Sequence, residues 1–265
     1  MPALFHPPPH SCARQLHAAA ETYFRAAWKL APQEAAELGL VQYRGKLGPN
    51  DPGSHRDRIR LFEQTLPLIE DLPPGEGDDW TDRRAFLAFL RTGLFFTRDH
   101  PRWQIDPQTH SSTAVNAVFH FLVRHAEDLR AVTPDILSLV AGIPRFLDEG
   151  RACLRRPVPL WTRLAVRSST HAATFLEQAA AQIIPLAESP ARAKRLFTAA
   201  ASAFRAYARH LQKIRTGPAN GFSVGRANFE FLLRERMGTD ASAAGRHGFG
   251  RTASRSGQVR TPARR

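Results

Sequence analysis

Apolar residues recur three and four positions apart in one segment after another, and this spacing is the strongest constraint on the fold. Between residues 113 and 130, for example, Val115, Val118, Phe119 and Leu122 occupy one face of a helix. Breaks rich in proline and glycine separate these segments, and no stretch alternates apolar and polar residues as a half-buried strand does. We therefore predict an all-α fold of about eight or nine helices in an antiparallel array.

Capping and helix-breaking residues predict where individual helices begin and end. Pro32 is expected to break a helix spanning residues 11–40, and Pro185 to end or bend one that starts at Pro159. Residues 100–110 are expected to form an irregular connection. The expected helix starts are Ser54 with Asp57 at N3, Thr81, Thr133-Pro134-Asp135 and Ser189-Pro190, and a short helix is expected from Arg226 to Met237 with Gly238 as its C-terminal cap.

The chain carries no predicted export or membrane signal. Its start, MPALFHPPPHSCARQL, lacks a basic segment followed by an apolar core, so no secretory signal is predicted. No run of about 18 apolar residues is present, so no transmembrane helix and no membrane partner are expected. Cys12 and Cys153 are far apart and are expected to be reduced thiols. We predict a cytoplasmic protein.

The net charge of +13 is unevenly distributed along the chain. Residues 245–265 contain six arginines and no acid, which leaves 13 − 6 = +7 on the remainder. No basic–aromatic interleaving or zinc-finger spacing occurs, so a nucleic-acid partner is not favoured. We predict a disordered lead at 1–10, a partial helical domain at 11–244 and an Arg-rich disordered tail at 245–265, which is a genuine extension or the product of a reading-frame shift.

The sequence Gly221-x-Ser223-x-Gly225 matches the nucleophile elbow of serine hydrolases. That turn requires a preceding strand, which presents the serine at the top of a sheet. A helical pattern ending in a loop precedes Gly221 instead. Ser223 is therefore interpreted as part of a helix entry and not as a nucleophile.

The histidines do not form a recognisable metal motif. None of the 11 is followed by glutamate, which excludes H-E-x-x-H. His120 and His125 are expected to share a helix but to point about 140° apart, which is poor geometry for a shared metal. Two other pairs remain open, because the spacing neither requires nor forbids their meeting: His6 with His10, and His100 with His110.

Charged residues provide only general candidates. Arg145 and Arg163 lie in otherwise apolar helices and could pair with a buried acid or a substrate carboxylate, although extension into solvent is the favoured interpretation. The neighbouring carboxylates Glu34/Glu37 and Asp148/Glu149 are interpreted as surface residues. We assign no catalytic, cofactor-binding or metal-binding residue.

Three segments in order resemble the first half of the bacterial "domain of unknown function 885" family. They are YFRAAWKLAPQEAAELGLVQYRGKLGPNDP, AVTPDILSLVAGIPRFLDEGRACLRRPVPLWTRLA and GFSVGRANFEFLLRERMG, and the resemblance covers roughly residues 20–244. It implies a mostly helical zinc-metallopeptidase-like protein of about twice this length, whose second half carries an H-E-x-x-x-G-H-type motif. No residue of this chain matches that motif. Zinc and a peptide substrate are therefore expected only in a full-length relative.

The sequence thus supports three hypotheses. The first is a catalytically inactive N-terminal half of a zinc-peptidase-like protein, which could self-associate through an exposed apolar face. The second is a helical protein-interaction module. The third is a basic nucleic-acid-associated protein that uses its tail.

Overall fold

A computed structural model describes residues 11–239 of the chain. This range contains helices and no strand, so the predicted all-α class is confirmed. The α-helices are labelled α1 to α10, and α5 is a single turn of four residues. Apart from that turn, nine α-helices remain in the described range, in agreement with the eight or nine expected. The predicted disordered lead and Arg-rich tail lie outside these residues.

The chain divides into two compact units, Met1–Phe222 and Ser223–Arg265. The described part of the first unit contains all helices except α10. In chain order its α-helices are α1 (Ser11–Leu30), α2 (Pro32–Glu37), α3 (Pro52–Glu70), α4 (Gly77–Leu94), α5 (Arg102–Ile105), α6 (Pro107–Arg124), α7 (Leu129–Cys153), α8 (Pro159–Ile183) and α9 (Pro190–Lys213). Shorter elements are the 3-10 turns η1 (Val41–Tyr43) and η3 (Ile184–Leu186) and the π-helical turn η2 (Phe95–Asp99).

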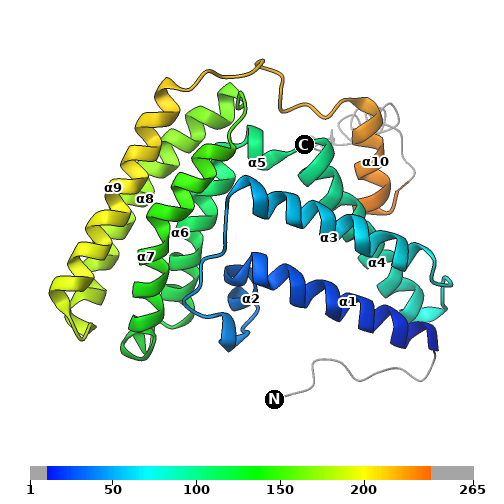
Figure 1. Cartoon of the computed structure of the whole chain (residues 1–265), viewed down its shortest axis with the longest axis horizontal. Coiled ribbons are helices and arrows are strands. Elements are labelled where there is room, and N and C mark those ends of the chain that lie inside the picture. Colours follow the sequence, from blue (N-terminus) through cyan, green and yellow to red (C-terminus); the bar gives the residue numbers. More distant parts are fainter. Residues whose placement is uncertain (1–10, 240–265) are drawn as a thin grey trace, which may run out of the picture. The chain divides into compact units, whose positions relative to one another are not determined.

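Helices α6 to α9 pack together as a bundle with short connections (Figure 1). Fully buried aliphatic residues of α7, including Ile136 and Ile143, face the other three helices. Between α8 and α9 the contact is made largely by alanines such as Ala173 and Ala200, whose small side chains allow close approach. Phe204 and Leu176 fill the larger spaces in this core.

Helices α1, α3 and α4 form a second layer with its own core. Tyr23 on α1 lies at its centre, with its ring 5.7 Å from those of Phe62 and Phe86. Ile69 and Leu90 are fully buried in the same cluster. Aromatic rings at these separations add to the stability that burial alone provides.

The segment from η1 to Asp51 connects the second layer with the bundle. Gly48 passes so close to α1 that a Cβ atom there would lie 2.4 Å from the carbonyl oxygen of Leu30. Its N–H donates to Gln33 Oε1 over 3.1 Å, and Gln33 is buried. A side chain at residue 48 would force this segment away from α1, so the path of the chain depends on glycine.

Several predicted helix boundaries are confirmed. The break at Pro32, the end of α8 before Pro185 and the start of α9 at Pro190 lie where the sequence predicts them.

Other predicted boundaries are wrong. Asp51, not Ser54, caps α3, because its carboxylate accepts the N–H groups of Gly53 and Ser54. Helix α4 begins at Gly77, before Thr81. Helix α7 begins at Leu129 and not at Thr133, because the Asp128 carboxylate accepts the N–H of Ala131 and caps the earlier start. The expected irregular segment 100–110 contains α5 and the start of α6.

The second unit contains α10, which spans Arg226–Met237 as the sequence predicts. Gly238 takes the left-handed conformation, with φ of 61°, and donates to the Arg234 carbonyl oxygen. Arg226 Nε and Glu230 Oε1 form an ion pair one turn apart, at 3.0 Å.

Candidate functional site

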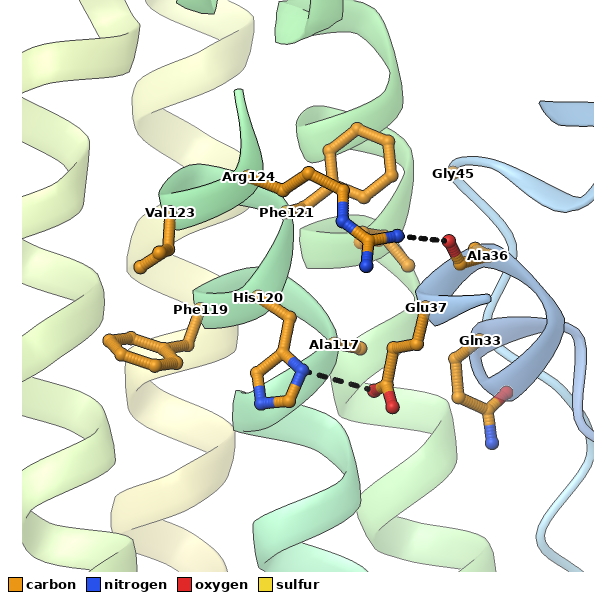
Figure 2. A pocket seen from close by; sticks show the side chains of 11 residues that line it. Gln33, Ala36, Glu37, Gly45, Ala117, Phe119, His120, Phe121, Val123 and Arg124 are labelled. Carbon is orange, nitrogen blue, oxygen red and sulfur yellow. Dashed lines mark hydrogen bonds and ion pairs between the residues drawn. The ribbon is translucent and has the colours of Figure 1, made fainter. Parts of the chain in front are cut away.

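A pocket of about 360 Å³ opens between α2 and α6 in the first unit. Figure 2 shows its apolar and polar walls. Ala117 and Leu139 are buried beneath it, whereas Phe119 and Val123 remain 47% and 61% exposed at its edge. Large apolar side chains that stay exposed around a concavity are typical of binding surfaces.

Charged groups from both helices border the pocket. His120 Nδ1 on α6 lies 3.8 Å from Glu37 Oε1 on α2, and Arg124 donates to the carbonyl oxygen of Ala36 over 3.4 Å (Figure 2). The Glu37–His120 separation is longer than a hydrogen bond, and both side chains are well exposed. This geometry suits recognition of a ligand's polar end more than proton transfer.

A second polar cluster is buried where α3, α6 and α7 meet. Its centre is the Asn50 side chain, only 4% exposed, whose Oδ1 lies 3.2 Å from His55 Nε2 and 3.1 Å from His110 Nδ1. Asn50 Nδ2 donates to the Phe146 carbonyl oxygen, and its backbone N–H donates to Glu149 Oε2. The Asn50 amide thus contacts groups of three different helices.

The two histidines of this cluster are held by ring and carbonyl contacts. The His55 ring stacks on Trp103 with centroids 4.5 Å apart, and His110 Nε2 lies 2.8 Å from the Trp103 carbonyl oxygen. A neutral His110 ring has one N–H for two facing oxygens. Both oxygens can only accept, and we assign that proton to Nε2 because its contact with the Trp103 carbonyl oxygen is the shorter one. Asn50 Oδ1 then accepts from His55.

Burial sets the protonation of this cluster. It lowers the pKa of His55 to about 3 and that of His110 to about 4, and the positive charge of Arg58 lowers both further. Burial also raises the pKa of the Cys153 thiol, which donates to the Asn50 carbonyl oxygen, to about 11. A buried neutral thiol is a poor nucleophile, so this cluster is suited to holding helices together and not to covalent catalysis.

The structure brings together neither His120 with His125, which helical spacing disfavoured, nor His100 with His110, which the spacing left open. His120 faces Glu37, whereas His125 follows the end of α6 and packs its ring against Phe121, 5.0 Å away. His110 meets His55, whereas the His100 ring stacks on Phe95. His6 and His10 lie outside the described residues.

Arginine and carboxylate predictions had mixed outcomes. Arg145 is half-exposed, as expected, but also donates to the carbonyl oxygens of Leu47 and Gly48. Arg163 is exposed. Interpreting Glu149 as a plain surface residue was wrong, because it accepts from both Asn50 N–H and Arg145. Ser223 lies in the irregular segment just before α10, and no strand precedes it in the described residues, as expected.

Residues 11–239 contain neither a candidate metal cluster nor a candidate membrane span. Within that range no group of three or more His, Cys, Asp or Glu side chains could hold a metal ion. None of the helices described is long and apolar enough to cross a membrane.

The sequence reasoning missed Asn50 and His55, although a signal for His55 was present. His55 precedes Ile59, Phe62, Leu66 and Ile69 at helical spacing, so it lies on the buried stripe of its own helix. A polar residue on such a stripe must find a buried partner. Asn50 gave no comparable signal, because it lies in an irregular segment whose path depends on the helices around it.

Comparison with known proteins identifies a fold and no family. No family model and no curated protein matches the chain. Among solved structures, a "putative lipoprotein of unknown function" from Shewanella oneidensis superimposes on 93% of this chain with a TM-score of 0.77 and 15% sequence identity. The chain spans 46% of that protein's length. At this identity the likeness shows a shared helical fold alone.

Proposed function

We propose that this chain is a non-catalytic helical module that supplies one part of a larger all-helical body. The superposition supports this proposal, because nearly the whole chain corresponds to about half of a longer chain. A module of this kind works by presenting surfaces to a second helical body.

The resemblance to the domain of unknown function 885 family gives this proposal a more specific form. In that form the chain is the N-terminal half of a zinc-peptidase-like protein, and it walls one side of a cleft. The zinc, its ligands and the peptide substrate belong to the other half, and a cytoplasmic location is part of the same proposal. The absence of H-E-x-x-H from the sequence supports it.

A second candidate function is a self-sufficient protein-interaction module. The α2–α6 pocket favours it, because Phe119 and Val123 are exposed beside a concavity with charged ends. Such a pocket fits an apolar side chain of a partner, with Arg124 and His120 beside the partner's polar groups. The basic nucleic-acid hypothesis remains a third alternative.

Metal content and hydrolytic activity test the first proposal. We expect the purified chain, analysed by plasma mass spectrometry after incubation with zinc and desalting, to retain well under one zinc per chain. It should not hydrolyse fluorogenic peptides. Stoichiometric zinc together with peptide hydrolysis would overturn the proposal. Size-exclusion chromatography separates the alternatives, because a self-sufficient module should be monodisperse and a half should self-associate.

A further inference from the structure

One exposed face of α8 combines leucine and arginine over its first turns. Leu160, Arg163, Leu164 and Arg167 are all exposed, and their three- and four-residue spacing places them on one side of the helix. Leu160 and Leu164 are 43% and 41% exposed. The helix contains no Asp or Glu before Glu177. This face is therefore both apolar and positively charged.

Arg102 of α5 extends this face. Its guanidinium carbon lies 4.9 Å from the ring centroid of Phe96 and 5.5 Å from that of Trp161. Trp161 lies between Leu160 and Arg163 in the first turn of α8, so Arg102 lies beside the start of this face. Contact with two rings orients the guanidinium, while Arg102 stays exposed to a ligand.

Arg156, in the loop before α8, adds a further charge at the same end. Val158 N–H donates to the Ile105 carbonyl oxygen, which holds this loop against α5. Arg156 has φ of 47°, an unfavourable conformation for a residue with a side chain. Such backbone strain is concentrated at functional positions in proteins.

These arginines lack acidic partners among residues 11–239. Arg156, Arg163 and Arg167 form no ion pair there, whereas Arg145, Arg151 and Arg205 on the neighbouring helices each pair with a carboxylate. Arg102 likewise forms no ion pair in that range, but it lowers the pKa of half-buried Asp106, which burial raises. The surface therefore presents several cations that form no ion pair with the carboxylates of residues 11–239.

We propose that this surface, made of Arg102, Arg156, Leu160, Arg163, Leu164 and Arg167, docks an acidic amphipathic helix of a protein partner. We call it the Leu/Arg surface. The proposal deepens the proposed function and rests on it, because it names the chemistry of the second helical body. Charge complementarity selects an acidic partner, and the two leucines select one with an apolar stripe.

The leucines also favour a protein over a nucleic acid. Nucleic-acid surfaces offer phosphates to cations and base faces to aromatic rings. Leu160 and Leu164 contact neither of these well. The Phe96 and Trp161 rings already have Arg102 over one face, so that face is not open to a base.

Fluorescence polarisation with the full chain tests the proposal. The probe is a labelled helical peptide of about 18 residues, five turns, with leucines at i, i+3, i+4 and i+7 and glutamates beside them. A peptide of the same composition with scrambled leucines and a single-stranded oligonucleotide serve as comparison probes. We expect the patterned peptide to bind most tightly, and its binding to weaken as salt increases.

Three variants locate the binding. Paired Arg163→Glu and Arg167→Glu changes should weaken peptide binding at least about tenfold. Arg156→Gly should also weaken it, without lowering the melting temperature, because glycine adopts positive φ without strain. Arg192→Glu with Arg195→Glu is the matched control, since these exposed arginines begin α9 at the opposite end of α8.

Three outcomes would overturn the proposal. They are no binding of the patterned peptide, equal weakening by the control pair, and tighter binding of the oligonucleotide. A failure here with no zinc and no hydrolysis leaves the proposed function in place. Zinc-dependent hydrolysis by the chain would instead contradict the proposed function itself.

Discussion

At the residue scale, the Asn50–His55–His110 cluster depends on a glycine that faces it. A Cβ atom on Gly150 of α7 would lie 2.6 Å from both Asn50 Nδ2 and His110 Cγ. Neither atom can retreat easily, because both side chains are buried and hydrogen-bonded. Glycine at this position costs some helix propensity and in return permits the amide and the imidazole to meet.

We expect Gly150→Ala to lower the free energy of unfolding by about 1–3 kcal/mol, because overpacking forces the cluster apart. Chemical denaturation followed by circular dichroism measures the change. Gly142→Ala on the same helix is the control, since its nearest neighbour is Leu47 Cβ at 3.3 Å. A loss at Gly142 as large as that at Gly150 would contradict this explanation.

The same two histidines predict sensitivity to acid. Their folded pKa values, about 3 for His55 and about 4 for His110, lie below the ordinary value of 6.5. Below pH 6.5 the unfolded chain therefore binds protons that the folded chain does not, so stability falls as the pH falls toward these values. We expect a loss of about 1.5 kcal/mol per histidine between pH 6.5 and 5.

Urea unfolding across that pH range measures this loss. His55→Gln should make the pH dependence shallower, because one of the two neutral histidines is removed. His120→Gln is the matched control, since His120 is half-exposed at the pocket. Stability that stays constant from pH 6.5 to 5 would show that the folded chain binds these protons as readily as the unfolded chain.

At the element scale, the sequence predicted which segments are helical better than it predicted where each helix starts. Periodicity depends on many residues, so the buried stripes of α4 and α9 could be recognised. On α6 the helix was predicted but its buried face was not, because Ala114, Ala117 and Phe121 are buried whereas Phe119 of the expected stripe is exposed. A helix cap depends on one side chain, and several residues that can cap a helix lie close together in the sequence. Asp51 and Ser54 both precede the apolar stripe of α3, and only Asp51 is the cap. Pro134, which was expected to mark a helix start, lies inside α7 because Asp128 caps that helix further upstream.

The polar site could not be predicted in the same way. Asn50, His55 and His110 come from an irregular segment, α3 and α6, so only the packing of those helices brings them together. The pocket likewise requires α2 to lie across α6. Helical spacing describes each helix by itself and contains no information about which faces of different helices meet.

The Asp51 cap gives a prediction at this scale. Asp51→Ala should destabilise the chain by about 1 kcal/mol, because the N–H groups of Gly53 and Ser54 lose their acceptor. Asp51→Asn retains an acceptor and should recover most of that stability. Thermal unfolding of the three proteins tests this. Equal losses for alanine and asparagine would indicate that charge, and not capping, is what Asp51 provides.

At the scale of the first unit, the buried apolar residues form two separate hydrophobic cores. The larger core lies within α6 to α9, and the smaller one joins α1, α3 and α4. Polar contacts cross between them, among them Asn50 with Phe146 and Arg145 with the carbonyl oxygens of Leu47 and Gly48. Because stability follows local burial, the layer with the smaller core should open more often than the bundle.

Hydrogen exchange with mass spectrometry can resolve these two parts. We expect amides of α1, α3 and α4 to exchange faster than those of α8 and α9 under native conditions. Asn50→Ala should increase exchange in the first group and leave α8 and α9 nearly unchanged, because Asn50 hydrogen-bonds across the boundary. Asn116→Ala, an exposed position on α6, is the matched control. If Asn50→Ala accelerates exchange equally in both groups, the unit opens as one cooperative body and the cluster stabilises the whole of it.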